Sequence, residues 1–233
     1  MIRFFDFIFS LIGLVLLSPI VIVLLIIGYF DTGSPVFCQE RVGKNKQPFN
    51  LYKFRSMHVD TKSVATHLAN YSAVTKYGAF LRKSKLDELP QLWNVLIGDM
   101  SLVGPRPLLM QYLPLYNERQ SLRHNVRPGV TGWAQVNGRN AISWEEKFEL
   151  DVWYVENQSV MLDLKIVALT LLKVFRRQDI TAAGEATMHA FEGSQDQSIA
   201  EISDLNRNVL RIYIKYPAQP EQLFVEQIFT RRP

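Results

Sequence analysis

The stretch from Phe7 to Phe30, FIFSLIGLVLLSPIVIVLLIIGYF, carries no charged side chain, and Asp6 and Asp31 bracket it. About 20 apolar residues at 1.5 Å each cross a hydrocarbon core roughly 30 Å thick, so a transmembrane helix is one interpretation. A secretory signal fits poorly, because one basic residue, Arg3, precedes the run and Leu17-Ser18-Pro19 lacks the small residues of a cleavage site. The run predicts a membrane-attached N-terminus.

A proline divides this run. Ser18-Pro19 lies near its middle, and proline lacks the amide hydrogen that a helix needs there. Each half, Phe7–Ser18 and Pro19–Phe30, reaches roughly 18 Å as a helix, enough to pass the membrane centre but not to cross. A helix–break–helix hairpin that enters and leaves by the same face is therefore the alternative, with the Ser18 hydroxyl able to bond a carbonyl freed by the proline. Because transmembrane helices tolerate proline kinks, these residues alone leave both open.

The basic residues around the run predict its orientation. Arg41, Lys44 and Lys46 follow it, whereas only Arg3 precedes it. By the positive-inside rule, the rest of the chain then faces the cytoplasm. A body placed there has access to cytoplasmic nucleotide-activated substrates.

The composition of the 233 residues is that of a folded protein. Hydrophobic residues make up 48% and charged residues 21%, which excludes a disordered or collagen-like chain. The 26 basic and 22 acidic residues give a net charge of +4. A single cysteine, Cys38, excludes an intrachain disulfide framework and a cysteine zinc site. The length predicts either one domain or a domain with an appendage.

The segment after the run is typical of a strand pair. Val36–Cys38 and Phe49–Phe54 favour strands, and Gly43–Lys46 breaks the pattern between them. Lys53 and Arg55 fit neither a clean core face nor a clean polar face, so a solvated strand edge is one interpretation of both.

Two later segments predict helices. Ser143–Glu156 is amphipathic, with Trp144 and Phe148 on its inner side, and we interpret Glu149-Leu150-Asp151 as part of its solvated face. Leu162–Arg177 is apolar with basic residues, which suits either a helix in the membrane interface or a core helix. The chain therefore predicts a mainly helical α+β body.

A third helix carries the first candidate for chemistry. Leu89, Leu92, Trp93, Leu96 and Ile97 recur on one helix face, and Gly98 suits its end. Pro90 then falls in the first turn, which places Asp87 at or beside the N-cap. There Asp87 either caps the helix or acts as an ionised catalytic carboxylate, because the helix dipole and the nearby Arg82, Lys83 and Lys85 favour the charged form.

Stiff loops then present arginines. In Gly104-Pro105-Arg106-Pro107 the two prolines restrict the backbone around Arg106, which lowers the entropy cost of bidentate contact with phosphate. Arg127-Pro128-Gly129 and the turn around Arg139 repeat the pattern. A solvated arginine in a proline-rich turn is the alternative. Arginines around a carboxylate pair favour an anionic substrate with a metal ion, whereas the nucleotide-loop, zinc-protease and nucleophile-elbow motifs do not occur.

Several motifs resemble the bacterial sugar transferase family, the monotopic phosphoglycosyl transferases. The resemblance spans about residues 2–193, and its motifs are Leu17-Ser18-Pro19, Tyr52-Lys53-Phe54-Arg55-Ser56-Met57, Leu86-Asp87-Glu88-Leu89-Pro90-Gln91-Leu92, Gly98-Asp99-Met100-Ser101, Gly104-Pro105-Arg106-Pro107 and Arg127-Pro128-Gly129-Val130-Thr131-Gly132-Trp133. It implies a re-entrant N-terminal hairpin broken at Ser18-Pro19, amphipathic interfacial helices, and a catalytic body on the cytoplasmic face of a bacterial inner membrane.

The resemblance also implies a reaction. A sugar 1-phosphate passes from a UDP-sugar to a polyprenol phosphate such as undecaprenyl phosphate, releasing UMP, as the first membrane step of glycan or glycoprotein assembly. Asp87 would attack the sugar-linked phosphorus to form an acyl-phosphate intermediate, and Glu88 would hold Mg²⁺ against the diphosphate. Our candidates for phosphate and nucleotide contacts are Lys53, Arg82, Arg106 and Arg139. The sugar is not readable from the sequence.

The domain organisation follows: residues 1–34 as membrane anchor, 35–193 as catalytic domain and 194–233 as an extension of unknown role, in which 209–216 alternates like a strand. The expected partners are the UDP-sugar, the polyprenol phosphate and the lipid bilayer; nucleic acid is not needed to explain the basic excess, and a homodimer is left open. The alternative function is a membrane-tethered, non-catalytic scaffold that binds anionic lipid. A transferase that moves the sugar alone is a second alternative.

Overall fold

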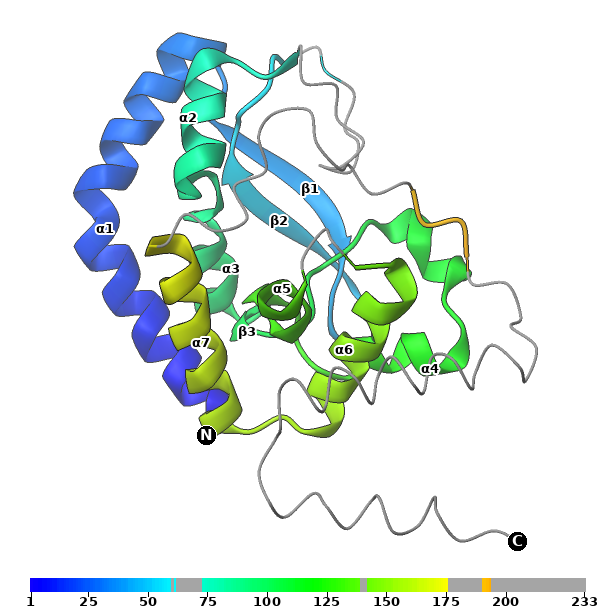
Figure 1. The fold of residues 1–233 in the computed structure, drawn as a ribbon. Helices are drawn as coiled ribbons and strands as arrows, with labels where there is room; N and C mark the ends of the chain where they lie inside the picture. The colour runs from blue at the N-terminus through cyan, green and yellow to red at the C-terminus, as the bar shows by residue number, and fades with distance from the viewer. Residues whose placement is uncertain (60, 62–72, 139–141, 176–189, 194–233) are drawn as a thin grey trace, which may run out of the picture. The chain divides into compact units, whose positions relative to one another are not determined.

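A computed structural model describes residues 1–59, 61, 73–138, 142–175 and 190–193. The chain divides into two compact units, Met1–Gly193 and Ser194–Pro233, and all described residues belong to the first. Its elements (Figure 1) are α1 Ile2–Thr32, β1 Val36–Val42, η1 Lys44–Lys46, β2 Pro48–Phe54, α2 Lys76–Ser84, η4 Leu86–Glu88, α3 Gln91–Ile97, β3 Ser101–Val103, η5 Met110–Leu115, α4 Glu118–Ser121, η6 Leu122–Asn125, β4 Gly129–Thr131, α5 Trp133–Asn137, α6 Trp144–Glu156 and α7 Val160–Phe175. The unit is mostly helical with two small sheets, as expected. The strand predicted at 209–216 lies outside the described residues.

The apolar N-terminal run forms the single helix α1, with Pro19 inside it, rather than two helices separated by a break. Pro19 cannot donate to the carbonyl of Val15, and the Ser18 hydroxyl donates to that carbonyl instead, at 2.7 Å. The hydrogen bond expected from the Ser18 hydroxyl is thus confirmed, and it explains why the helix continues past the proline. Figure 1 shows α1 bent rather than straight. α1 is long and apolar enough to cross a membrane, by length and composition. The re-entrant path stays a prediction.

The N-terminal end of α1 is anchored on the body. Asp6 is 4% exposed, and its carboxylate accepts hydrogen bonds from the Ser101 hydroxyl at 2.9 Å and from the amide of Leu102 at 3.0 Å. Arg3 donates to the carbonyl of Leu96 at 2.6 Å and to the carbonyl before it, at the C-terminal end of α3. A cation at that end satisfies carbonyls that have no helical partner.

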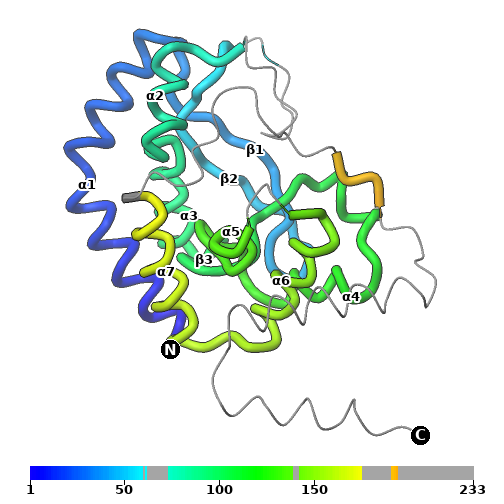
Figure 2. Tube along the Cα trace, viewed as in Figure 1, coloured from blue at the N-terminus to red at the C-terminus, as the bar shows by residue number. Residues whose placement is uncertain are grey.

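The C-terminal end of α1 is anchored on the same unit. Thr75 donates its hydroxyl to Asp31 at 2.7 Å, and the Tyr77 hydroxyl donates to the carbonyl of Leu24, also at 2.7 Å. Leu24 is buried with Leu81 of α2 in one hydrophobic cluster. The tube in Figure 2 shows α2 and α3 beside α1 along its length. Both ends of the apolar helix therefore contact one body.

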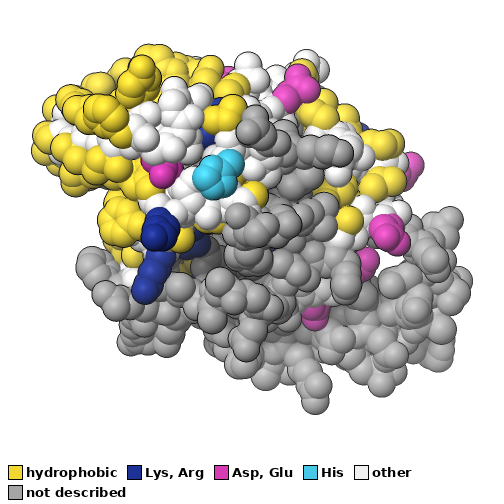
Figure 3. Space-filling view, turned by 90° about the horizontal axis from the view of Figure 1, so that it is seen from above, with side chains coloured by type: hydrophobic (Ala, Val, Ile, Leu, Met, Phe, Trp, Pro, Cys, Tyr) yellow, Lys and Arg dark blue, Asp and Glu magenta, His cyan; other side chains and the backbone are white. Residues whose placement is uncertain are grey.

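The remaining faces of α1 are exposed and apolar. Figure 3 shows hydrophobic side chains gathered along the left edge of the view, where α1 lies. Helix α7 also exposes large apolar side chains, although it buries Ile166. The exposed set on these two helices includes Phe4, Leu16, Ile22, Val23, Ile26, Phe30, Met161, Leu164, Leu171 and Leu172. Apolar surface of this extent marks a site for lipid or another apolar partner.

The predicted strand pair is confirmed. β1 and β2 are antiparallel, with Gln39 opposite Leu51 and Phe37 opposite Lys53, and η1 occupies the predicted break. Because alternate residues of a strand share a face, Lys53 lies on the same face as Leu51, which packs in a core cluster with Val95 of α3. The solvated-edge interpretation of Lys53 is therefore wrong: the face that carries it is the inner face of the hairpin.

The second sheet is a short parallel pair that brings two loops together. Ser101 of β3 pairs with Gly129 of β4, and the amide of Gly129 donates to the carbonyl of Pro105 at 3.0 Å. A β-carbon on Gly129 would lie 2.0 Å from the amide nitrogen of Gly104. Only glycine permits this approach, which fixes the loop that carries Arg106.

The predicted helix at 143–156 is confirmed as α6, with a capping box formed by Ser143 and Glu146. The interpretation of its acidic segment as a solvated face is wrong at Asp151, which is 3% exposed. Asp151 follows Phe148 by three residues, so it falls on the helix face that is buried.

Candidate active site

Asp87 and Glu88, called the dyad from here on, lie in a short turn between two helices. Lys85, at φ 62° and ψ 13°, ends α2 in a left-handed conformation, and η4 then covers Leu86–Glu88. The expectation that Asp87 sits at or beside the N-cap of the next helix is wrong, because α3 begins at Gln91 with Pro90 as its N-cap. The amides of Glu88 and Leu89 instead donate to the carbonyls of Lys85 and Leu86, three residues earlier, at 3.4 and 3.2 Å, so these residues close a 3₁₀ turn ahead of α3. The predicted end at Gly98, φ 100°, is confirmed.

Glu88 forms an ion pair with Arg106. Arg106 Nη2 lies 2.5 Å from Glu88 Oε1, and their side chains are 44% and 22% exposed. Burial by itself would raise the pKa of Glu88, but the charge of Arg106 and the hydrogen bond to it outweigh burial and lower that pKa. The pKa of Arg106 is raised in turn by the charge of Glu88. The proline-flanked loop thus places Arg106 in contact with the dyad.

Asp87 differs from Glu88 in its hydrogen bonding and in the direction of its pKa shift. It is half-buried, and its Oδ1 atom is buried without a hydrogen-bond partner. Burial, followed by the charge of Glu88, raises the pKa of Asp87 to about 6, while Lys85, Lys53 and Arg106 act in the opposite direction. A carboxylate with an unpartnered oxygen beside cations is suited to attack on an anionic phosphorus.

Lys53 reaches the site from β2. Burial, followed by the charge of Arg41, lowers the pKa of Lys53 to about 8, and the charge of Asp87 opposes that shift. Two candidate phosphate contacts, Lys53 and Arg106, therefore lie in the electrostatic field of Asp87 and Glu88. They come from elements far apart in the sequence.

The other two candidate arginines are placed differently. Arg82 lies on α2, and its Nε donates to the Ser56 hydroxyl at 2.8 Å, which ties α2 to the end of the hairpin. Arg139 lies outside the described residues.

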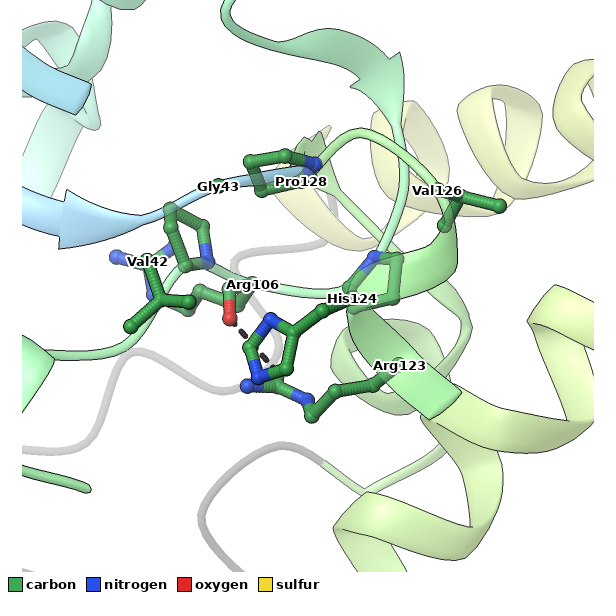
Figure 4. A pocket seen from close by; sticks show the side chains of 9 residues that line it. Val42, Gly43, Arg106, Arg123, His124, Val126 and Pro128 are labelled. Carbon is green, nitrogen blue, oxygen red and sulfur yellow. Dashed lines mark hydrogen bonds between the residues drawn. The ribbon is translucent and has the colours of Figure 1, made fainter. Parts of the chain in front are cut away.

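A buried arginine that sequence reasoning missed holds the Arg106 loop. Arg123 donates through Nη2 to the carbonyl of Arg106 at 2.8 Å and to the Asp151 carboxylate at 2.7 Å, and Figure 4 shows the first of these contacts. The Arg123 and Asp151 side chains are 2% and 3% exposed. The position of Asp151 on the apolar face of α6 was the signal that could have identified this pair.

A shallow pocket lies beside this loop (Figure 4). His124 borders it; burial, followed by the charge of Arg123, lowers the pKa of His124 to about 3, so the imidazole is neutral at pH 7. Asp87 and Glu88 do not line the pocket, so it is not the site of the dyad. The lining residues are Val42, Gly43, Pro105, Arg106, Pro107, Arg123, His124, Val126 and Pro128.

The residues of the dyad suit one kind of metal ion. No group of three or more His, Cys, Asp or Glu side chains arranged to hold a metal occurs among the residues that the structure describes. Mg²⁺ does not need such a group, because it is commonly held by one or two carboxylates together with substrate phosphates and water. The unpartnered Oδ1 of Asp87 and the carboxylate of Glu88 fit that donor set.

Comparison with known proteins places this chain in a class of enzymes that transfer sugars. The family model described as bacterial sugar transferase matches residues 1–177, and the chain belongs to that family. The chain is 52% identical over 197 residues to the uncharacterized sugar transferase EpsL of Bacillus subtilis (strain 168). The matched residues cover 84% of this chain and 98% of that protein. The resemblance found in the sequence motifs is thus confirmed.

Relatives named for a reaction are longer. The UDP-glucose:undecaprenyl-phosphate glucose-1-phosphate transferase of Escherichia coli (strain K12) is 41% identical over 181 residues, 73% of this chain and 39% of that protein. The undecaprenyl-phosphate galactose phosphotransferase of Salmonella typhimurium is 37% identical over 192 residues, 75% of this chain and 40% of that protein. The chain spans about two fifths of the length of these two relatives.

Proposed function

We propose that this protein transfers a sugar 1-phosphate from a UDP-sugar to a polyprenol phosphate such as undecaprenyl phosphate, with release of UMP, through a covalent intermediate on Asp87. The observation that carries the proposal is the unpartnered Asp87 oxygen beside the Glu88–Arg106 ion pair and Lys53. The names of the relatives, which include glucose and galactose phosphate transfer to undecaprenyl phosphate, support the reaction class.

The reaction balances as two displacements at one phosphorus. An oxygen of Asp87 attacks the sugar-linked phosphorus of the donor, and the bond from that phosphorus to the bridging oxygen breaks, so that UMP leaves with the electron pair. A phosphate oxygen of the polyprenol phosphate then attacks the same phosphorus, and the bond to Asp87 breaks. The product is a polyprenyl diphosphate sugar, and the free carboxylate returns. Two steps let one site accept a soluble donor and then a lipid acceptor.

Cations make this attack feasible. An ionised carboxylate and a diphosphate repel each other, so the negative charge on the donor must be balanced before Asp87 approaches. Arg106 is held by its prolines and by Arg123, and Lys53 lies on the inner face of the hairpin. When bound, Mg²⁺ would neutralise charge on the diphosphate, with Glu88 as its protein ligand.

The anchoring of α1 supports a membrane arrangement in which the body and both ends of the helix lie on one face. A helix that spans the bilayer would carry one end beyond the reach of a body on the other side. Asp6 and Asp31, near opposite ends of α1, are both hydrogen-bonded to the same unit. We therefore propose a re-entrant, monotopic attachment to the bacterial inner membrane, with the body in the cytoplasm as the basic residues after the run indicate.

A labelling experiment tests this topology. In a Cys38→Ser background, one cysteine is placed in a short extension ahead of Met1, and another is introduced by Glu40→Cys, at an exposed position of β1. We expect neither cysteine to react with a membrane-impermeant maleimide in intact cells, and both to react after the inner membrane is opened. Reaction of one cysteine alone in intact cells would mean that α1 spans the membrane.

The pKa of Lys53 predicts a pH dependence. Because that pKa is lowered to about 8, the free protein loses this positive charge as the pH rises through 8, and an anionic donor then binds more weakly. We expect kcat/KM for the UDP-sugar to fall above about pH 8, and Lys53→Arg, which keeps its charge, to lose that fall. An alkaline fall that is the same in Lys53→Arg would show that another group is responsible.

The assay that tests the function is a panel of UDP-sugars scored for their nucleotide product. Purified protein with Mg²⁺ and undecaprenyl phosphate is expected to release UMP from at least one donor, which also identifies the sugar. Release of UDP would instead indicate transfer of the sugar alone, and no release from any donor would favour the non-catalytic scaffold.

A further inference from the structure

Arg41 is a buried cation that has no carboxylate partner among the residues the structure describes. It lies on β1 and is 6% exposed; its Nη2 donates to Gln39 Oε1 at 2.5 Å, and its Nε has no hydrogen-bond partner. Among the described parts of the chain, the ion pairs join Arg106 to Glu88, Arg119 to Glu149 and Glu156, and Arg123 to Asp151, and none of them includes Arg41.

Arg41 lies near two of the cations that surround the dyad, Lys53 and Arg106. In the hairpin, Arg41 is opposite Phe49 and Lys53 is opposite Phe37, so the alternation of side chains places Arg41 and Lys53 on one face. The amide of Val42, the next residue, donates to the carbonyl of Leu108 at 3.0 Å, which joins this strand to the segment after the Arg106 loop. Arg41 therefore lies on the inner face of the hairpin, next to the segment that follows the Arg106 loop.

Neighbouring charges make the position of Arg41 unfavourable in the free protein. Burial, followed by the charge of Arg106, lowers the pKa of Arg41 to about 10, and Arg41 in turn lowers the pKa of Lys53. Three cations thus share a site in which one of them, Arg106, already neutralises Glu88. Removing a cation from water without a counter-charge is costly, and the cost is recovered when an anion enters.

We propose that Arg41 binds a phosphate group of a substrate, with its free Nε–H as a donor, and thereby completes a three-cation site with Lys53 and Arg106. This proposal rests on the proposed function. The phosphate belongs either to the diphosphate of the nucleotide donor or to the lipid phosphate acceptor, which offer the same chemistry to a guanidinium.

Binding of two separate probes distinguishes these sources without turnover. Affinities for UDP with Mg²⁺ and for farnesyl phosphate are measured on the full chain in detergent, for the unsubstituted protein and for Arg41→Gln and Arg41→Lys. Arg119→Gln, which alters an exposed cation in surface ion pairs, is the control. We expect Arg41→Gln to weaken one probe by about tenfold or more and Arg41→Lys to weaken it less. The probe that is affected identifies the phosphate.

A second readout separates binding from a structural role. Because Arg41→Gln removes an unpaired buried charge, we expect the melting temperature without ligand to stay the same or rise. Unchanged affinity for both probes would overturn the proposal, as would a fall in melting temperature for both Arg41 variants. UMP release with unchanged affinities would overturn this proposal alone, whereas an unsubstituted protein that binds neither probe would overturn the proposed function as well.

Discussion

The Asp87→Asn variant is expected to lose UMP release by at least about 10³-fold, while its fold is retained. The amide cannot supply the anionic oxygen that attacks phosphorus, and loss of a nucleophile removes a step that the remaining residues cannot replace. Asparagine has nearly the same shape, and the carboxylate it replaces is half-buried with an unpartnered oxygen, so little packing or hydrogen bonding is lost. The measurement is the initial rate of UMP release from the donor found in the panel.

Controls separate chemistry from folding in this experiment. The melting temperature of Asp87→Asn is expected to equal or exceed that of the unsubstituted protein. Glu149→Gln removes an acidic group from a surface ion pair and is expected to retain full activity. Full UMP release by Asp87→Asn would refute the role of Asp87 as nucleophile.

The second large effect is expected at the Arg123–Asp151 pair. The Asp151→Asn variant leaves a guanidinium buried without its counter-charge, which typically costs about 3–5 kcal/mol of unfolding free energy. For a unit of this size that corresponds to a fall of about 10 °C in melting temperature. The Arg119–Glu149 pair, with side chains 52% and 23% exposed, is expected to contribute less than about 1 kcal/mol.

The same pair links stability to the site. Because Arg123 also donates to the carbonyl of Arg106, Asp151→Asn should disturb the loop that pairs with Glu88. The double variant Arg123→Met with Asp151→Leu should recover much of the melting temperature, since neither charge then remains buried. A melting temperature for Asp151→Asn within 2 °C of the unsubstituted protein, about the scatter expected for a surface change, would contradict this account.

Local patterns in the sequence predicted the elements that carry their own signals. Alternation identified the hairpin, Gly98 identified the end of α3, and the amphipathic pattern identified α6. The Ser18 hydroxyl was expected to replace the hydrogen bond that Pro19 cannot make, and it does. In each case the signal lies within the element itself or next to it in the sequence.

Predictions failed where distant parts of the chain decide the outcome. Lys53 belongs to the inner face because the hairpin packs on α3, and Asp151 is buried because Arg123, 28 residues earlier, pairs with it. Asp87 lies outside the α-helix because Leu86–Glu88 close a separate 3₁₀ turn after the left-handed Lys85. The register of the hairpin also places Arg41, which sequence reasoning used only to orient the membrane segment, on the face that carries Lys53.

The covalent intermediate is the central claim, and a donor labelled with ³²P on the sugar-linked phosphorus tests it most directly. Protein incubated with this donor and Mg²⁺, without polyprenol phosphate, should retain the label on a peptide that contains Asp87, and should release it to the lipid when undecaprenyl phosphate is added. A donor labelled in the uridine should leave no label on the protein. Stoichiometric transfer of the label to the lipid by Asp87→Asn, or by a protein that never retains it, would contradict the account.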